Sequence, residues 1–216
     1  MTKQEIKQYI LKERIILAAR GLQIEEVLPF AEAVYAGGLR LLEITFDQAS
    51  PTCIEDAVRK IALLTEAFDG RMLIGAGTVL TVEQAEAAVN AGAKYLLSPS
   101  LDRDVLEYAV SRGVVMIPGV MTPTEAQNAT LWGADMVKLF PTGSLGIPYI
   151  KAIRAPLSHI PMIAMGGVNE QNLREYLAVC EGVGIGSGIF NRALLDAKDY
   201  AEITRRARAF AEQTTG

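Results

Sequence analysis

The stretch MVKLFPTG, residues 136–143, is a short apolar run interrupted by a lysine. Its valine and leucine are typical of a buried strand, yet lysine is almost never fully buried without a partner, because its charge is costly to remove from water. Side chains of a strand alternate between two faces, so Lys138 and Phe140 share one face. Lys138 therefore either reaches a surface, pairs with a carboxylate, or is held inside for its chemistry.

This run is one of eight that recur along the chain. Helical patterns such as IEEVLPFAEAVYAGG and TVEQAEAAVNAGA lie between the runs, and Thr122 and Glu125 fit a helix capping box with Pro123 at the first helical position. Strands that alternate with helices predict an α/β fold, a (β/α)₈ TIM barrel, with an open doubly wound sheet as the alternative. We expect strands at residues 15–20, 41–46, 72–77, 95–100, 114–120, 136–141, 161–166 and 182–186.

The 216 residues suit a single (β/α)₈ barrel domain over 1–216, because no linker or change of composition divides them. Half of the residues are hydrophobic and the mean hydropathy is +0.21, which provides a sizeable core. Ile6, Tyr9 and Ile10 have helical spacing ahead of the first strand, and they predict an extra N-terminal helix packed on the barrel.

Charge and composition exclude several classes of function. A formal net charge of −4 gives no basic footprint for nucleic acid. The single histidine, His159, argues against a histidine-rich metal site, although carboxylate-bound Mg²⁺ stays open. Two cysteines form no disulfide framework, the N-terminus is too polar for a signal peptide, and no apolar run is long enough to span a bilayer. We therefore expect a soluble cytoplasmic protein without membrane or nucleic-acid partners.

Two ionisable residues interrupt apolar strands. An inward-facing Lys138 would have its pKa lowered by desolvation, which makes the amine available to add to a ketone and form a Schiff base. Glu43 interrupts LLEITF, residues 41–46, and would face the same cavity from another side, where a carboxylate can move protons. The alternative is a plain buried ion pair between the two.

Glycines follow the last two strands. Gly166 and Gly167 end one, and Ser187 stands between two glycines after the other. Barrels often bind phosphate with these two loops, through backbone N–H groups that glycine lets a ligand approach. Ordinary tight turns are the alternative.

Three further residues at predicted strand ends are candidates. Thr78 can bind a substrate carboxylate or hydroxyl, or it can cap a helix. Arg20 can clamp an anion, or it can form a surface salt bridge. Pro99 shapes a loop at the same end.

Taken together, these residues resemble the family of 2-keto-3-deoxy-6-phosphogluconate (KDPG) aldolases and 4-hydroxy-2-oxoglutarate (KHG) aldolases. The resemblance runs from about Arg14 to the last helix. It implies a class I pyruvate-dependent aldolase (a lyase) without metal or other cofactor, acting in carbohydrate metabolism as a homotrimer. The motifs that carry it, in this order, are AGGLRLLEIT (36–45), IGAGTV (74–79), SPS (98–100), IPGVMTPTE (117–125) and VKLFP (137–141).

The resemblance also implies roles by matching position. Lys138 would form the Schiff base with the C2 ketone, Glu43 would be the general acid/base, and Phe140 would pack beside the imine. Thr78 and Pro99 would border the pyruvate carboxylate. The distal phosphate would be held by Gly166, Gly167 and the loop around Ser187.

Two positions depart from the family pattern. Asp47 stands where many members carry an arginine, and an acidic residue cannot clamp a carboxylate or phosphate, so Arg20 must carry more or the substrate differs. Met165 precedes Gly166 where a threonine is common, and the lost hydroxyl bears on chain length and stereochemistry. Neither departure touches Lys138 or Glu43.

Two other functions fit the same sequence. A phosphosugar isomerase or epimerase would use Glu43 as a base without an imine. A non-catalytic barrel would bind sugar phosphates or serve as a scaffold, although two buried ionisable groups are costly for a scaffold.

Overall fold

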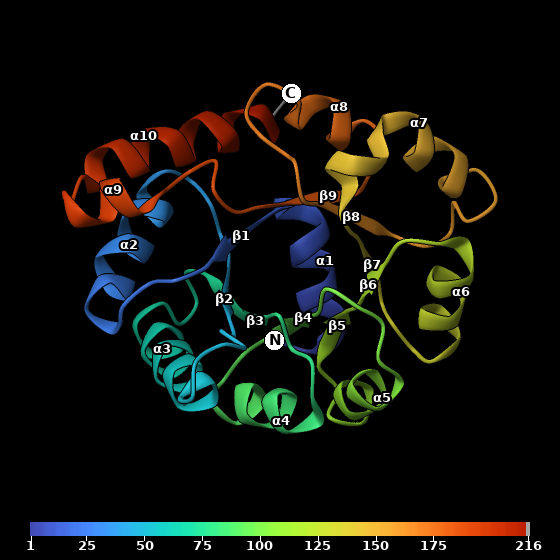
Figure 1. Ribbon diagram of the computed structural model, residues 1–216, viewed down its shortest axis with the longest axis horizontal. Coiled ribbons are helices and arrows are strands. Elements are labelled where there is room, and N and C mark those ends of the chain that lie inside the picture. Colours follow the sequence, from blue (N-terminus) through green and yellow to red (C-terminus); the bar gives the residue numbers. More distant parts are fainter. Residues whose placement is uncertain (215–216) are drawn as a thin grey trace.

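The computed structural model describes residues 1–214. Within these residues, parallel strands form one sheet that curves into a ring, and helices surround it (Figure 1). The strands are β1 Ile15–Ala19, β2 Leu41–Thr45, β3 Leu73–Gly77, β4 Tyr95–Leu97, β5 Val115–Ile117, β6 Gly119–Val120, β7 Val137–Leu139, β8 Met162–Met165 and β9 Gly182–Ile185.

The ring closes through a single stretch of chain. The predicted strand at residues 114–120 is divided at Pro118 into β5, which pairs with β4, and β6, which pairs with β7. Proline has no N–H to donate, but its carbonyl accepts a hydrogen bond from the Lys138 N–H at 2.9 Å. The two ends of the sheet are thus joined covalently. The predicted (β/α)₈ barrel is confirmed, and the open doubly wound sheet is excluded.

Apart from α1, the helices follow strands and lie outside the ring (Figure 1). The helices are α1 Lys3–Glu13, α2 Ile24–Ala36, α3 Cys53–Ala67, α4 Val82–Asn90, α5 Arg103–Ser111, α6 Pro123–Leu131, α7 Thr142–Arg154, α8 Leu173–Leu177, α9 Arg192–Asp196 and α10 Tyr200–Ala211, followed by a 3₁₀ turn at Glu212–Thr214. Within residues 1–214, none of them combines the length and apolar composition that a membrane span requires.

The extra N-terminal helix is confirmed as α1. A capping box between Thr2 and Glu5 begins it. Its buried Ile6 and Ile10 pack on the barrel interior at the end where the strands begin, so in projection α1 lies in the middle of the ring (Figure 1). Because α1 covers this end, the opposite end is the one left open for a site.

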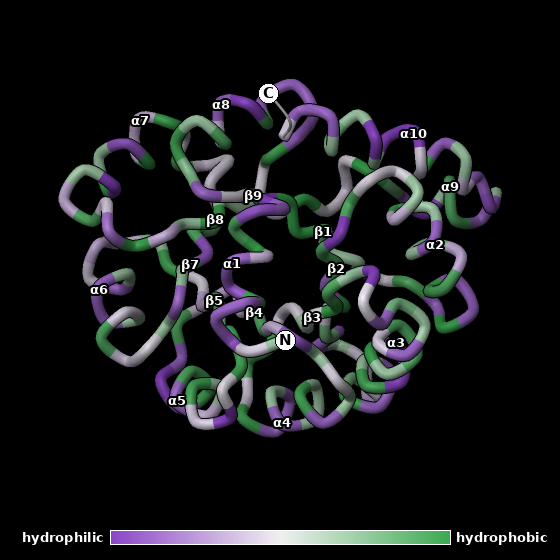
Figure 2. The backbone as a smooth tube through the Cα atoms, turned by 180° about the vertical axis from the view of Figure 1, so that it is seen from behind, coloured by the Kyte–Doolittle hydropathy of each residue, from purple (hydrophilic) through white to green (hydrophobic). Residues whose placement is uncertain are grey.

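Alternation along the strands produces two apolar regions. Strand residues that face outward pack against the surrounding helices. Hydrophobic and hydrophilic residues alternate along these helices, as the colours in Figure 2 show. Residues facing inward form a second cluster, here called the lumen cluster: Ile6, Ile10, Ile16, Leu41, Leu73, Tyr95, Leu97, Val115, Ile117, Met136, Ile163 and Met165. The half of the barrel interior nearest the amino ends of the strands is therefore filled with mostly apolar side chains.

Candidate active site

The carboxyl ends of the strands surround a cavity of about 890 Å³. This is the end at which barrel enzymes place their chemistry. The barrel brings together residues far apart in the sequence, and all the predicted site residues except Glu43 line this cavity: Arg20, Thr78, Pro99, Lys138, Phe140, Gly166, Gly167 and Ser187.

Lys138 lies on the inner face of β7, between β6 and β8. Its register partners are Gly119 and Ile163, and the side chain is only 6% exposed. Burial lowers the pKa of the amine; the Glu43 carboxylate acts to raise it, and Arg20 lowers it further. Lys138 is thus not a surface lysine, and burial favours its neutral, nucleophilic form.

Glu43 lies on the inner face of β2 and is 2% exposed. Its carboxylate leans across β3, where a Cβ added to Gly77 would lie 2.7 Å from Oε1, so glycine makes the room for it. Burial raises the pKa of this carboxyl, and Lys138 and Arg20 oppose that effect only in part. Its Oε2 atom has no hydrogen-bond partner.

Lys138 and Glu43 interact electrostatically without forming an ion pair. The ion pairs within residues 1–214 include neither of them. The alternative of a plain buried ion pair is therefore not what the structure contains. Burial instead favours the neutral amine of Lys138, which can attack a carbonyl, and raises the pKa of Glu43, which suits a carboxyl that takes up and returns a proton.

Arg20 and Thr78 meet at one side of the cavity. The Arg20 Nη2 donates to Thr78 Oγ1 at 3.4 Å. Thr78 has φ 58°, a left-handed conformation that a β-branched residue rarely adopts. The following helix is capped by Thr81, so the helix-cap alternative for Thr78 is wrong. Its side chain lines the cavity instead.

Asp47 does not line the cavity. Its Oδ1 accepts a hydrogen bond from the Ala49 N–H at 3.1 Å, within its own turn. The next residue, Gln48, donates to the Thr78 carbonyl at 2.8 Å and so supports the strained residue. Arg20 is therefore a cation on this side of the cavity, whose lining does not include Asp47.

The glycine pair after β8 is sterically required. Gly166 and Gly167 both have φ 88°, and a Cβ added to Gly167 would lie 2.6 Å from the Gly143 Cα. The Gly166 carbonyl accepts hydrogen bonds from Thr142 Oγ1 at 2.9 Å and from the Gly143 N–H at 2.6 Å. These contacts fix the loop against the start of α7 and keep its backbone at the cavity wall.

Phe140 and Met165 supply apolar walls. The Lys138 Nζ lies 4.8 Å from the centre of the Phe140 ring, consistent with a shared strand face. Met165 lies over β9, where a Cβ added to Gly184 would lie 1.7 Å from its methyl group. Met165 thus presents a thioether to the cavity.

Several cavity residues were not predicted from the sequence. Asn169, Phe190, Asn191 and Arg192 also line it, all in loops or helix starts after β8 and β9. Arg192 donates to Asp196 at 2.8 Å and pairs with Glu26, whose side chain is mostly buried. Ser187 was predicted because it follows the carboxyl end of a strand. Arg192 lies only a few residues further along the same segment, so the same criterion, applied to a longer stretch, would have included it.

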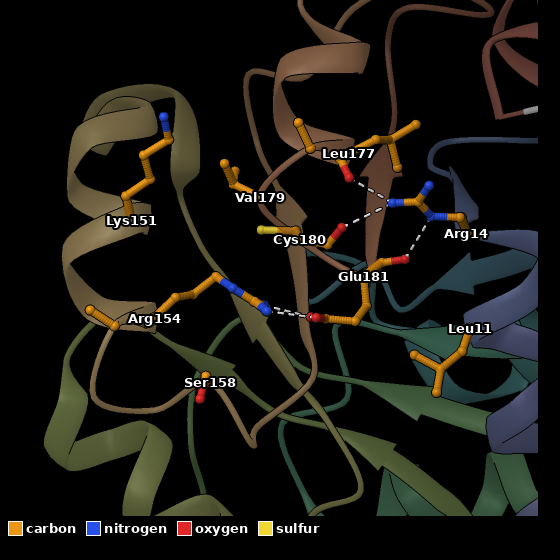
Figure 3. A pocket seen from close by; sticks show the side chains of 11 residues that line it. Leu11, Arg14, Lys151, Arg154, Ser158, Leu177, Val179, Cys180 and Glu181 are labelled. Carbon is orange, nitrogen blue, oxygen red and sulfur yellow. Dashed lines mark hydrogen bonds and ion pairs between the residues drawn. The ribbon is translucent and has the colours of Figure 1, made fainter. Parts of the chain in front are cut away.

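A second hollow of about 670 Å³ lies near the amino ends of β1 and β9 (Figure 3). Arg14 donates to the carbonyls of Leu177 at 2.7 Å and Glu181 at 3.0 Å, and Arg154 forms a bidentate pair with the Glu181 carboxylate at 2.5 and 2.6 Å. Burial acts to raise the pKa of Glu181, but Arg154 and a backbone N–H outweigh it and leave that pKa lowered. These arginines join the ends of α1 and α7 to the turn before β9.

Metal ligands do not gather anywhere in residues 1–214: no three His, Cys, Asp or Glu side chains there are placed to hold an ion.

Comparison with known proteins gives a consistent family. The model of the family described as KDPG and KHG aldolase matches residues 6–206. The chain is 36% identical over 185 residues to a 2-dehydro-3-deoxy-6-phosphogalactonate aldolase of Escherichia coli, covering 85% of this chain and 87% of that one. It is 35% identical over 193 residues to the KHG/KDPG aldolase of the same organism, covering 88% and 87%.

Solved structures agree. A KDPG aldolase from Legionella pneumophila, determined with pyruvate captured as a covalent carbinolamine intermediate, superimposes with a TM-score of 0.84 at 31% identity, covering 94% of this chain and 97% of that one. A carbinolamine is the first adduct of an amine with a ketone, the step that opens class I aldolase chemistry. By sequence and by fold, this chain belongs to the KDPG and KHG aldolase family of class I pyruvate aldolases.

Proposed function

We propose that this chain cleaves a 2-keto-3-deoxy sugar acid, with KDPG as the substrate, to pyruvate and glyceraldehyde 3-phosphate. The observation that carries the proposal is Lys138, a buried lysine with a lowered pKa at the wall of the cavity. A neutral amine in that place adds to the C2 ketone of a bound 2-keto acid. An isomerase or epimerase that used Glu43 as a base would need no imine at Lys138.

The reaction begins at the Lys138 amine. Nζ attacks C2, and the carbinolamine loses water to give an iminium, which acts as an electron sink. The C4 hydroxyl gives its proton to Glu43, directly or through water, while the C3–C4 bond breaks and its electrons form the enamine. The aldehyde leaves, Glu43 returns the proton to C3 of the enamine, and water hydrolyses the resulting imine to free pyruvate and Lys138.

The cavity orients the substrate between two anion-binding ends. Arg20 and Thr78 bind the carboxylate end, with Pro99 at its border. The phosphate end is held by the backbone of Gly166 and Gly167 and by the loop around Ser187, since glycines let an anion approach N–H groups closely. The span between the two ends sets the chain length that fits.

Met165 bears on the configuration at C4. Its thioether cannot accept a hydrogen bond as a threonine hydroxyl would, so the side chain offers shape rather than polar recognition to the middle of the substrate. The relatives include aldolases named for the phosphogluconate and for the phosphogalactonate, which differ at C4. Screening both epimers is therefore part of the test.

We further propose that the enzyme is a cytoplasmic homotrimer, as the family resemblance implies. Sedimentation-velocity measurement of the full chain tests this: a species of three chains supports it, and a monomer or dimer contradicts it.

The experiment measures pyruvate release from KDPG, from its C4 epimer and from 4-hydroxy-2-oxoglutarate, with Lys138→Ala as the control. The proposal expects the highest kcat/KM for KDPG and no release by the variant. Faster cleavage of the epimer or of the unphosphorylated acid would replace the substrate and keep the chemistry. Equal release by Lys138→Ala would refute the chemistry itself.

A further inference from the structure

Tyr95 is a fully buried tyrosine at the start of β4, in the lumen cluster and outside the cavity lining. Its hydroxyl has no hydrogen-bond partner, although a buried phenol normally finds one. Within residues 1–214, the other buried side-chain atom of the barrel interior without a hydrogen-bond partner is Glu43 Oε2; those of Thr65 and Tyr108 lie outside it, on α3 and α5. Two orphaned polar atoms in one closed lumen call for a common explanation.

Both side chains lie across the same strand. A Cβ added to Gly75 would lie 2.4 to 2.6 Å from three atoms of the Tyr95 ring, and one added to Gly77 would lie 2.7 to 2.9 Å from the Glu43 carboxylate. Gly75 and Gly77 are two residues apart on β3, so their missing side chains share one face. The two glycines thus form a trough in which the Tyr95 ring and the Glu43 carboxylate lie one layer apart.

We propose that Tyr95 is a positioning residue for Glu43: its hydroxyl donates a hydrogen bond to one buried water, which in turn donates to the Glu43 carboxylate. The proposal rests on the proposed role of Glu43 as general acid/base. A donor at Oε2 fixes the carboxyl in the trough and leaves Oε1 to exchange a proton with the substrate. The substrate and Tyr95 then approach Glu43 from opposite sides, since the tyrosine lies deeper in the barrel.

The charges around Glu43 set the direction of the effect. Burial raises the pKa of Glu43, while Lys138 from β7 and Arg20 after β1 act to lower it. Burial and the nearby Glu43 raise the pKa of Tyr95 well above its usual range, so its phenol is a donor at neutral pH. A hydrogen bond relayed from that phenol through the water favours the ionised carboxylate, and its loss therefore raises the pKa of Glu43 further.

The test compares Tyr95→Phe with a matched control, Tyr108→Phe. The hydroxyl of Tyr108 on α5 is also buried and without a partner, but it lies outside the barrel interior. Both variants keep the ring, so folding is preserved. The readout is exchange of the pyruvate methyl hydrogens with D₂O, followed by NMR from pH 4 to 9, which reports proton transfer without any aldehyde partner.

In Tyr95→Phe we expect the borohydride-trapped pyruvate adduct on Lys138 to form as in the wild type. The acid limb of the exchange profile should move up by about one pH unit, so exchange on that limb slows about tenfold, the size expected for a hydrogen bond to a charged group. The profile of Tyr108→Phe should coincide with that of the wild type.

A second measurement does not depend on activity: urea unfolding of the same proteins across pH. When folding raises the pKa of a carboxyl, the free energy of unfolding of the protein falls as pH rises from the pKa of that group in the unfolded chain toward its pKa in the folded protein. Tyr95→Phe should therefore lose stability relative to the wild type as pH rises through the Glu43 pKa, whereas any difference in Tyr108→Phe stays constant with pH.

The outcomes separate the two proposals. If the difference in unfolding free energy between Tyr95→Phe and the wild type does not change with pH, and the exchange profile is not shifted, the role of Tyr95 is overturned and the aldolase chemistry stays intact. If that difference changes with pH but the wild type forms no pyruvate adduct, the link between Tyr95 and Glu43 is supported and the proposed function is refuted.

Discussion

Lys138 on β7 and Glu43 on β2 are both buried inside the barrel, and they act on each other electrostatically without forming an ion pair. Burial moves their pKa values in opposite directions, down for the amine and up for the carboxyl. A structural ion pair would do the reverse, since each charge would favour the other. The opposite pKa shifts therefore suit a nucleophile and a proton carrier better than an ion pair that stabilises the fold.

Replacing Lys138 with methionine should abolish turnover and adduct formation without lowering the free energy of unfolding. Methionine keeps the volume and removes an amine that is unfavourable to bury when charged. Activity assays and urea unfolding of Lys138→Met measure both. The matched control is Lys151→Met, because Lys151 is an exposed lysine on α7 and its loss should leave turnover unchanged. Ordinary turnover in Lys138→Met would contradict the assignment.

Replacing Glu43 with glutamine should separate imine formation from proton transfer. Glutamine fits the same trough against Gly77 but cannot carry the proton, so we expect kcat to fall roughly 10²–10⁴-fold. The adduct of pyruvate with Lys138 should still be trapped by borohydride, at an extent close to that of the wild type. Steady-state kinetics and intact mass measure the two steps. Full activity in Glu43→Gln would remove the general acid/base role.

The rate of adduct formation should depend on pH as the lowered pKa of Lys138 requires. The neutral amine is the reactive form, so the rate rises with pH and levels off above the lysine pKa, below the ordinary value of 10.5. Ionised Glu43 acts to raise that pKa, so Glu43→Gln should move the midpoint to lower pH. Single-turnover trapping from pH 6 to 10 measures both profiles. A midpoint at or above that of free lysine would argue against an activated amine.

Alanine at Gly167 should weaken both the fold and the binding of a phosphorylated substrate. The residue has φ 88°, and the new Cβ would meet the Gly143 Cα at 2.6 Å, so the loop after β8 must shift. We expect KM for the phosphorylated substrate to rise and stability to fall by more than the control. That control is Gly113→Ala, with φ 66° and no atom within 4 Å of the added Cβ, for which left-handed strain alone costs about 1–2 kcal/mol. Equal effects of the two substitutions would show that the contact with Gly143 is unimportant.

Strand alternation was sufficient to predict much of the site. It placed Lys138 and Phe140 on one face, and the position of Gly166 and Gly167 after a late strand brought them to the same cavity. These predictions succeed because the side-chain period of a strand and the single active end of a parallel barrel are general geometry.

Other features depend on contacts that no local pattern encodes. The break at Pro118 depends on which strands pair across the closure of the barrel. The turn that holds Asp47 away from the cavity depends on its own backbone geometry. Arg192 and Asp196 are four residues apart, a spacing typical of a salt bridge on a helix surface, and only the folded loop places Arg192 at the cavity. The sequence around Tyr95 is that of an ordinary buried strand, and only the structure shows its hydroxyl without a partner in the barrel interior that also holds Glu43.

The role of Lys138 as the imine-forming residue is tested most directly by the intact mass of the protein after incubation with pyruvate and sodium borohydride, followed by peptide mapping. We expect one reduced pyruvate adduct per chain, on Lys138. No adduct on a folded protein, or an adduct on another lysine, would contradict it.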